Sequence, residues 1–152
     1  MIIKLDAADY EKCNNIWNMK KNAYNIDMAK RFYAQLLSGN RIIFIYTEND
    51  KFIGEGSLVL DENGDSDYTI PHQRIYLSRM VVKKKCQNRG IGGKMLRFLI
   101  DYARGLGYIE MSVGVDVNNI RARWLYEKNG FTNIVFVGED SGGKYVKLVK
   151  KL

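Results

Sequence analysis

The sequence is poor in the residues that hold metals or cross-link small proteins. Its 152 residues include two cysteines, Cys13 and Cys86, and one histidine, His72. No Cys/His cluster has the spacing of a zinc site, and two cysteines do not make the disulfide framework of a small secreted domain. A single histidine also disfavours a hydrolase built on a Ser/His/Asp or Cys/His arrangement. We therefore expect neither a metal site nor a disulfide scaffold.

Long apolar runs are missing as well. The first residues, MIIKLDAADYEKC, carry Lys4 and Asp6 and so do not resemble a signal peptide. No apolar run approaches the ~20 residues that cross a bilayer. Hydrophobic residues make up 46% and charged residues 27%, with one proline, Pro71, and no linker or repeat. This composition predicts a single globular domain over residues 1–152 that is cytoplasmic and is not inserted in a membrane.

Positive charge is in excess. There are 24 Lys and Arg against 17 Asp and Glu, a formal charge of +7, which makes an anionic partner plausible: nucleic acid, a membrane surface or a phosphorylated cofactor. Residues 83–100 contain no acidic side chain. The basic residues of that stretch are Lys83, Lys84, Lys85, Arg89, Lys94 and Arg97.

Apolar periodicity and turn residues predict a mixed α/β protein. An apolar start, Ile2 to Leu5, precedes the first helices. The expected elements are two helices within 7–37; strands at 41–46 and 52–60 around the turn 48–51; a strand at 74–82; a helix from about 90; a strand at 108–115; a helix at 119–129; and strands at 131–137 and 144–148.

The segment Gln87–Gly93, QNRGIGG, lies between a predicted strand and a predicted amphipathic helix. Glycines at such a junction permit a tight turn that presents several backbone N–H groups in one direction, and the helix adds its positive N-terminal end. The segment is therefore suited to bind a phosphate. It matches neither the dinucleotide pattern G-x-G-x-x-G nor the P-loop pattern. The alternative is a flexible loop that enters a helix with a solvated basic face.

A second motif occupies residues 118–131, NNIRARWLYEKNGF. Asn119 is a good N-cap residue, and Gly130 is a good helix end. Helical spacing places Asn119, Ala122 and Tyr126 on one face, with Trp124 and Leu125 expected to pack beside it.

Together, Val82 followed by Gln87-x-x-Gly90-x-Gly92 and Val115 followed by Asn119-x-x-Ala122-x-x-Leu125-Tyr126-Glu127-Lys128-x-Gly130-Phe131 resemble the GNAT superfamily of N-acetyltransferases, which use acetyl-coenzyme A. With the element order, the resemblance covers essentially the whole chain. It implies a mixed, mostly antiparallel central sheet of about seven strands flanked by helices. Lys84 departs from the pattern, since many relatives carry proline there; the backbone chemistry of the turn does not depend on it.

The resemblance also implies roles for residues. The strand before the turn usually bulges and splays from its neighbour, so the backbone of Met80 and Val82 would face pantetheine or the thioester, with the Val82 N–H as oxyanion donor. Asn119 would contact the pantetheine arm, and Tyr126 would be the general acid for the leaving thiolate. The coenzyme A pyrophosphate would be bound by the backbone of Asn88, Arg89, Gly90, Ile91, Gly92 and Gly93, assisted by the Gln87 side chain.

The general base and the acceptor pocket are less determined. Glu55, Asp116, His72 and a water chain are the alternatives for the base, with Glu110 further from the end of its strand. The acceptor pocket is expected from the N-terminal helices and the loops near 61–73 and 138–143. Candidate lining residues are Trp17, Tyr24, Tyr33, Asp61, Glu62, Asp65 and Asp67. The alternative for the three aromatic residues is packing in the core, and the alternative for the four acidic residues is a solvated loop.

The resulting hypothesis is transfer of an acetyl group from acetyl-CoA to a primary amine of a small molecule or protein, by direct attack. The alternative is a non-catalytic acyl-CoA-binding or sensing module. Nucleic acid is disfavoured, because no aromatic-plus-basic stripe or helix-turn-helix signal is present. Cys86 is expected to be a packed thiol, and Lys144, Lys147, Lys150 and Lys151 a solvated edge. The oligomeric state, including a homodimer, stays open.

Overall fold

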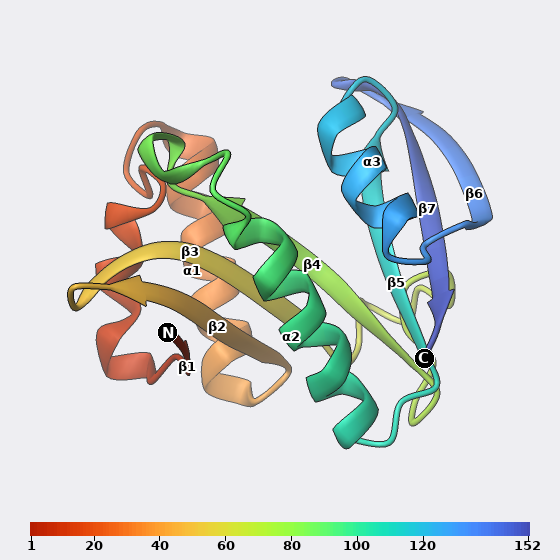
Figure 1. Cartoon of the computed structure of the whole chain (residues 1–152), viewed down its shortest axis with the longest axis horizontal. Coiled ribbons are helices and arrows are strands. Elements are labelled where there is room, and N and C mark those ends of the chain that lie inside the picture. Colours follow the sequence, from red (N-terminus) through yellow and green to blue (C-terminus); the bar gives the residue numbers. More distant parts are fainter. The chain divides into compact units, whose positions relative to one another are not determined.

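The computed structural model of the chain describes residues 1–152 and contains one sheet with the strand order β1-β2-β3-β4-β5-β7-β6. The sheet is mixed, mostly antiparallel and flanked by helices, which confirms the predicted fold class (Figure 1). Two of the helices, η1 and η2, are 3₁₀ helices. The elements are β1 (Ile2–Lys4), η1 (Ala7–Asn15), α1 (Ala23–Ser38), β2 (Arg41–Glu48), β3 (Lys51–Val59), β4 (Arg74–Val82), η2 (Lys84–Cys86), α2 (Ile91–Gly105), β5 (Glu110–Asp116), α3 (Ile120–Lys128), β6 (Asn133–Asp140) and β7 (Gly143–Lys151).

The chain divides into two compact units. Unit 1 comprises Met1–Leu58 and Arg79–Leu96, and unit 2 comprises Val59–Ser78 and Arg97–Leu152. Both β4 and α2 contribute residues to each unit. No helix of the structure is both long and apolar enough to cross a membrane.

Local signals set the ends of the elements in unit 1. Asn49 and Asp50 have φ of +52° and +61°, which is the backbone of a type I′ turn and joins β2 to β3 as a tight hairpin, as predicted. Asn22 caps α1 by accepting a hydrogen bond from the Asn25 N–H, and Gly39, at φ +82°, ends it. The first expected helix forms as the 3₁₀ helix η1.

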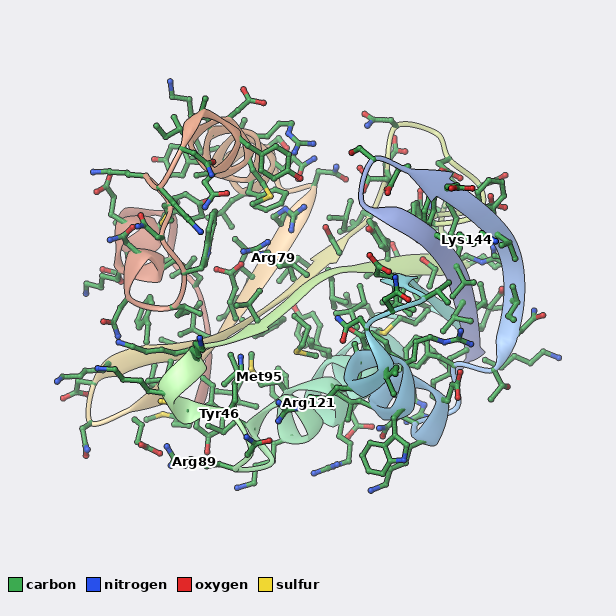
Figure 2. The ribbon with its side chains drawn as sticks, turned by 90° about the horizontal axis from the view of Figure 1, so that it is seen from above. Tyr46, Arg79, Arg89, Met95, Arg121 and Lys144 are labelled. Carbon is green, nitrogen blue, oxygen red and sulfur yellow. The ribbon has the colours of Figure 1, made fainter.

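The strands of unit 1 are covered on two faces. On one face η1 and α1 bury residues such as Cys13 and Phe32 against Ile43 and Ile45 of β2. On the other face Ile91 and Met95 of α2 pack against Ile53, Tyr46, Met80 and Val82. Figure 2 shows this division: Arg79 points toward the α1 side of the strands, whereas Tyr46 and Met95 lie on the α2 side.

One irregularity in β3 determines the surroundings of Glu55. Phe52 packs with the η1 and α1 cluster, but Ile53 packs with α2, and a Cβ on Gly54 would also meet Met95. The alternation of the strand therefore slips by one residue. Glu55 returns to the η1 side as a consequence, where its side chain is 2% exposed.

Unit 2 is built around β5. Its residues Glu110–Val113 pair in parallel with Arg74–Leu77 of β4, and the whole of β5 pairs antiparallel with β7. β6 pairs with β7 and forms the edge, with a register shift between Ile134 and Phe136. In Figure 1, α3 lies in front of β5. The buried Phe131 follows α3, and its ring meets the ring of Tyr126 edge-on, with centroids 5.7 Å apart.

Two expectations about exposure are wrong. Trp124 does not pack beside Tyr126: it is 61% exposed, with the Lys128 ammonium 4.7 Å from its ring. Side chains two residues apart on an α-helix point in directions about 200° apart around the helix axis. Because Tyr126 is buried, Trp124 therefore points outward. Lys147 is not part of a solvated edge. It is 7% exposed, and its Nζ lies 2.9 Å from Asp65 Oδ2 and 3.3 Å from Asp67 Oδ2.

Candidate functional site

The turn between β4 and α2 has the backbone that the glycine pattern predicts. Asn88 and Gly90 have φ of +66° and +78°, in the left-handed region. An asparagine tolerates this region, whereas glycine adopts it without a steric penalty. The Lys94 N–H donates to the Gly90 carbonyl at 3.1 Å, so the first helical hydrogen bond of α2 begins at Gly90.

This geometry leaves the first N–H groups of α2 available. Ile91, Gly92 and Gly93 form the first turn, and N–H groups there have no acceptor within the helix. The Ile91 side chain is buried against Met95, which anchors the turn to unit 1. Lys84, Lys85 and Lys94 are exposed around it. Oriented N–H groups, the positive end of a helix and exposed ammonium groups together suit a phosphate-bearing ligand.

The side chains of Gln87 and Arg89 already have protein partners. The Gln87 amide donates to the Val82 carbonyl at 3.1 Å and so ties the turn back to the end of β4. The Arg89 guanidinium forms a bidentate pair with Glu48, with Nη1–Oε1 and Nη2–Oε2 distances of 3.1 and 2.5 Å. The hydrogen bond from Arg89 lowers the pKa of the Glu48 carboxyl. The charge of Arg89 is therefore partly neutralised, and its expected role rests on its backbone.

This pair gives a prediction for coenzyme binding. We expect Glu48→Gln to tighten acetyl-CoA binding about twofold to fivefold at low salt, because it removes a negative charge beside the turn, and the gain should vanish at high salt. Calorimetric titration at two salt concentrations measures it. Glu11→Gln, which removes another exposed carboxylate of unit 1, should change little. Weaker binding by Glu48→Gln would contradict this account of Arg89.

At the end of β4, a backbone N–H group points away from the neighbouring strand β3. Met80 and Val82 pack their side chains toward α2, while Val81 packs toward η1 and α1, so this stretch alternates regularly. The Lys83 N–H donates to the Ile53 carbonyl of β3 at 2.8 Å. By alternation, the Val82 N–H points away from β3. Residues 78–82 also lie beyond the part of β4 that pairs with β5.

Asn119 and Tyr126 belong to α3, in unit 2. Asn119 is the N-cap: its Oδ1 accepts from the Ala122 N–H at 3.2 Å, which leaves its amide nitrogen to meet a ligand. Tyr126 is 7% exposed, and burial raises the pKa of its phenol to about 12. The phenol is thus protonated at neutral pH and can donate a hydrogen bond.

The candidate bases differ in their surroundings. Glu55 lies 3.4 Å from Trp17 Nε1, and its Oε2 lies 3.2 Å from Arg79 Nε without hydrogen-bond alignment. His72 is exposed, at φ +59°. Glu110 pairs with Arg74 at 2.6 Å; burial opposes a lower pKa, but its hydrogen bonds from Gln73 and Arg74 outweigh burial and lower it.

Asp116 is the remaining side chain among these candidates. It ends β5, is half-buried, and its Oδ1 accepts from the Asn118 N–H at 3.0 Å. It lines a pocket of about 440 Å³ within unit 2. The pocket joins the loop after β3 to the β6–β7 hairpin, two of the segments expected to line an acceptor pocket, but no residue of the N-terminal helices lines it. Its lining residues are Asp65, Tyr68, Tyr76, Gly114, Val115, Asp116, Asp140, Tyr145 and Lys147.

The N-terminal candidates have other surroundings. Trp17 packs beneath the Arg79 guanidinium, which is 4.3 Å from its ring. Tyr24 is exposed, and Tyr33 lines a second pocket, between η1 and α1.

The acidic candidates of the loop after β3 also differ from one another. Asp65 and Asp67 form ion pairs with Lys147, and Asp61 is exposed. Glu62 is half-buried, and Cys86 is packed against the α2 cluster as expected.

Sequence reasoning missed the tyrosines and the lysine of the unit 2 pocket. A signal for two of them was present, because Gly114 and Gly138 interrupt otherwise apolar strands, and a glycine there marks the close approach of another group. A Cβ on Gly114 would collide with the Tyr68 hydroxyl, and one on Gly138 with the Tyr145 ring.

Comparison with known proteins identifies the family of the chain and agrees with the fold. The acetyltransferase (GNAT) family model matches residues 6–131. YhfO, an uncharacterized N-acetyltransferase of Bacillus subtilis (strain 168), is 30% identical over 113 residues, covering 73% of this chain and 72% of that protein.

Two solved structures share the fold. PaiA N-acetyltransferase from Thermoplasma acidophilum, in complex with coenzyme A, has a TM-score of 0.71 at 19% identity and covers 100% of this chain and 98% of that chain. YncA from Salmonella typhimurium, with its cofactor acetyl-CoA, has a TM-score of 0.72 at 23% identity and covers 100% and 93%. The match of the family model over residues 6–131, together with the similarity to YhfO, shows that the chain belongs to the acetyltransferase (GNAT) family.

Proposed function

We propose that the protein transfers the acetyl group of acetyl-CoA to a primary amine by direct attack. The observation that carries the proposal is the turn at Gly90, whose left-handed backbone opens the first N–H groups of α2 toward an anion. The exposed lysines around it, Lys84, Lys85 and Lys94, complement a coenzyme that bears several phosphate charges. Acetyl-CoA supplies the activated acyl group.

Two groups of the chain are assigned to the chemistry. The Val82 N–H, directed away from β3, is the proposed donor to the oxygen on which negative charge develops. Tyr126 is the proposed donor to the departing thiolate. With its pKa raised to about 12 by burial, the phenol stays protonated across the pH range in which an amine is free to attack, so it can stabilise the departing thiolate by donating a hydrogen bond.

For the base we favour Asp116 over the other candidates. The carboxylate of Glu55 is held between Arg79 and Trp17, and His72 is on the surface. Asp116 lines a pocket. Its Oδ1 accepts a hydrogen bond from the Asn118 N–H, and its second carboxylate oxygen, Oδ2, remains for the amine. The carboxylate can therefore bind the acceptor as an ammonium ion, take one proton from it and pass that proton to water.

The proposal predicts that saturating acetyl-CoA raises the melting temperature. Ligand at 100 times its Kd stabilises a folded protein by about 2.7 kcal/mol, which corresponds to roughly 8 °C for a chain of this size. Differential scanning calorimetry measures the shift, and dephosphorylated pantetheine is the control that should give far less. No shift with any acyl-CoA would refute the proposal.

An amine screen that measures released thiol then separates an enzyme from an acyl-CoA sensor. Turnover with at least one amine supports transfer. Tight acetyl-CoA binding without turnover across monoamines, diamines and N-terminal peptide amines would favour the non-catalytic alternative.

A further inference from the structure

Glycines in strands β5 and β6 leave room for the tyrosine side chains that line the pocket in unit 2. The Tyr68 hydroxyl occupies the space above Gly114, and the Tyr145 ring occupies the space above Gly138, so any larger side chain at either glycine would displace a ring. Tyr76 stacks on Tyr68 with ring centroids 4.1 Å apart. The aromatic walls are therefore built into the sheet and are not a chance gathering of exposed rings.

The same face of the sheet carries carboxylates. Ser112 Oγ donates to the Tyr68 carbonyl at 2.6 Å, which places the loop after β3 on the face shared by Ser112, Gly114 and Asp116. On β6, Asp140 shares a face with Gly138 for the same reason. Tyr145 lies between the two strands, opposite Asp116 of β5 and Gly138 of β6 in the pairing register.

Negatively charged side chains outnumber positively charged ones in the pocket. Three carboxylates, Asp65, Asp116 and Asp140, line it together with one ammonium, Lys147. Lys147 is committed to Asp65 and Asp67 and lies over the Tyr68 ring at 4.5 Å. No lysine or arginine pairs with Asp116 or Asp140, whose Oδ1 atoms accept only from the Asn118 and Gly142 N–H groups.

We infer that this pocket binds a second positively charged group of the acceptor, so that the substrates are diamines or polyamines rather than monoamines. Carboxylates attract an ammonium by charge, and tyrosine rings attract it through their negative faces. Lys147 over Tyr68 shows that this face already accommodates one ammonium among carboxylates and rings. The inference rests on the proposed acetyltransferase function and specifies its acceptor.

The test compares pentane-1,5-diamine with pentan-1-amine, which differ by one amine at equal chain length. The expected kcat/KM for the diamine is about fivefold to tenfold higher, through a lower KM, and the preference should shrink with added salt. Asp140→Asn should bring the ratio close to about two, which is the statistical factor left by the two equivalent amines of the diamine. This variant keeps an oxygen that can accept from the Gly142 N–H and so preserves the turn.

Glu139→Gln is the matched control. Glu139 is the neighbour of Asp140 on β6, and adjacent strand residues face opposite sides, so this variant should keep the diamine preference. A diamine advantage no larger than this statistical factor, or a larger advantage that survives Asp140→Asn, would overturn the inference while leaving acetyl transfer standing.

A titration that does not need turnover separates the two proposals. Protein saturated with coenzyme A should bind pentane-1,5-diamine more tightly than pentan-1-amine in a calorimeter. Failure of coenzyme A to bind refutes the proposed function. Binding of coenzyme A with no diamine binding, or with no difference between the amines, refutes the acceptor class alone.

Discussion

Replacement of Tyr126 by phenylalanine is expected to lower kcat tenfold or more, with little change in the Kd for acetyl-CoA. The phenol is the proposed donor to the leaving thiolate, and positioned proton donors contribute at least this much to rates. The variant keeps the ring that meets Phe131 edge-on, so its folding should be unaffected. Steady-state kinetics on a verified amine, with calorimetry for the coenzyme, measure both quantities.

Tyr10 provides a matched control for this substitution. Burial raises the pKa of both phenols, but the Tyr10 hydroxyl donates to the Ala29 carbonyl at 2.8 Å. Tyr10→Phe should therefore cost about 1 kcal/mol of stability and leave kcat unchanged. Unchanged turnover in Tyr126→Phe would remove Tyr126 from the mechanism without affecting the family assignment.

The second large effect is expected at the turn between β4 and α2, which we propose binds the phosphates of the coenzyme. Gly90→Ala introduces a Cβ where φ is +78°, which costs roughly 1–2 kcal/mol in the left-handed region and favours a shift of the backbone. Because the site consists of backbone N–H groups, we expect the Kd for acetyl-CoA to rise at least about tenfold, close to 1.4 kcal/mol. Titration calorimetry with acetyl-CoA measures the change.

Gly39→Ala separates strain from binding. Gly39 is also in unit 1, has a similar φ of +82°, and a Cβ at either glycine would meet nothing within 4 Å. Both variants should lose similar stability in urea, while only Gly90→Ala loses coenzyme affinity. Equal affinity in the two variants would show that the turn does not bind the phosphates.

Local chemistry explains what could be predicted from the sequence. The hairpin at Asn49 and Asp50, the cap at Asn119 and the turn at Gly90 each depend on the conformational preferences of one or two residues, so their positions follow from the chain itself. The strand and helix order follows from periodicity for the same reason. The two motifs are continuous stretches of sequence and could be identified as such.

Features that depend on distant partners could not be predicted in this way. Burial of Lys147 depends on Asp65 and Asp67, and burial of Glu55 depends on a one-residue slip in β3 that brings it to Arg79 and Trp17. Helical spacing alone could not show that Trp124 faces outward, since it gives relative directions and not which side meets the sheet.

The contact of Lys147 with Asp65 and Asp67 also has a consequence for the order of folding during synthesis. The partners lie 82 and 80 residues apart along the chain, and β5 pairs with β7 along its whole length. The ion pairs that tie the loop carrying Tyr68 to β7 thus cannot form until residues 143–151 have been synthesised. Contacts of such long sequence separation form late. The unit 2 pocket is then among the last parts of the nascent protein to be completed, whereas the hairpin of β2 and β3 can form from neighbouring residues alone.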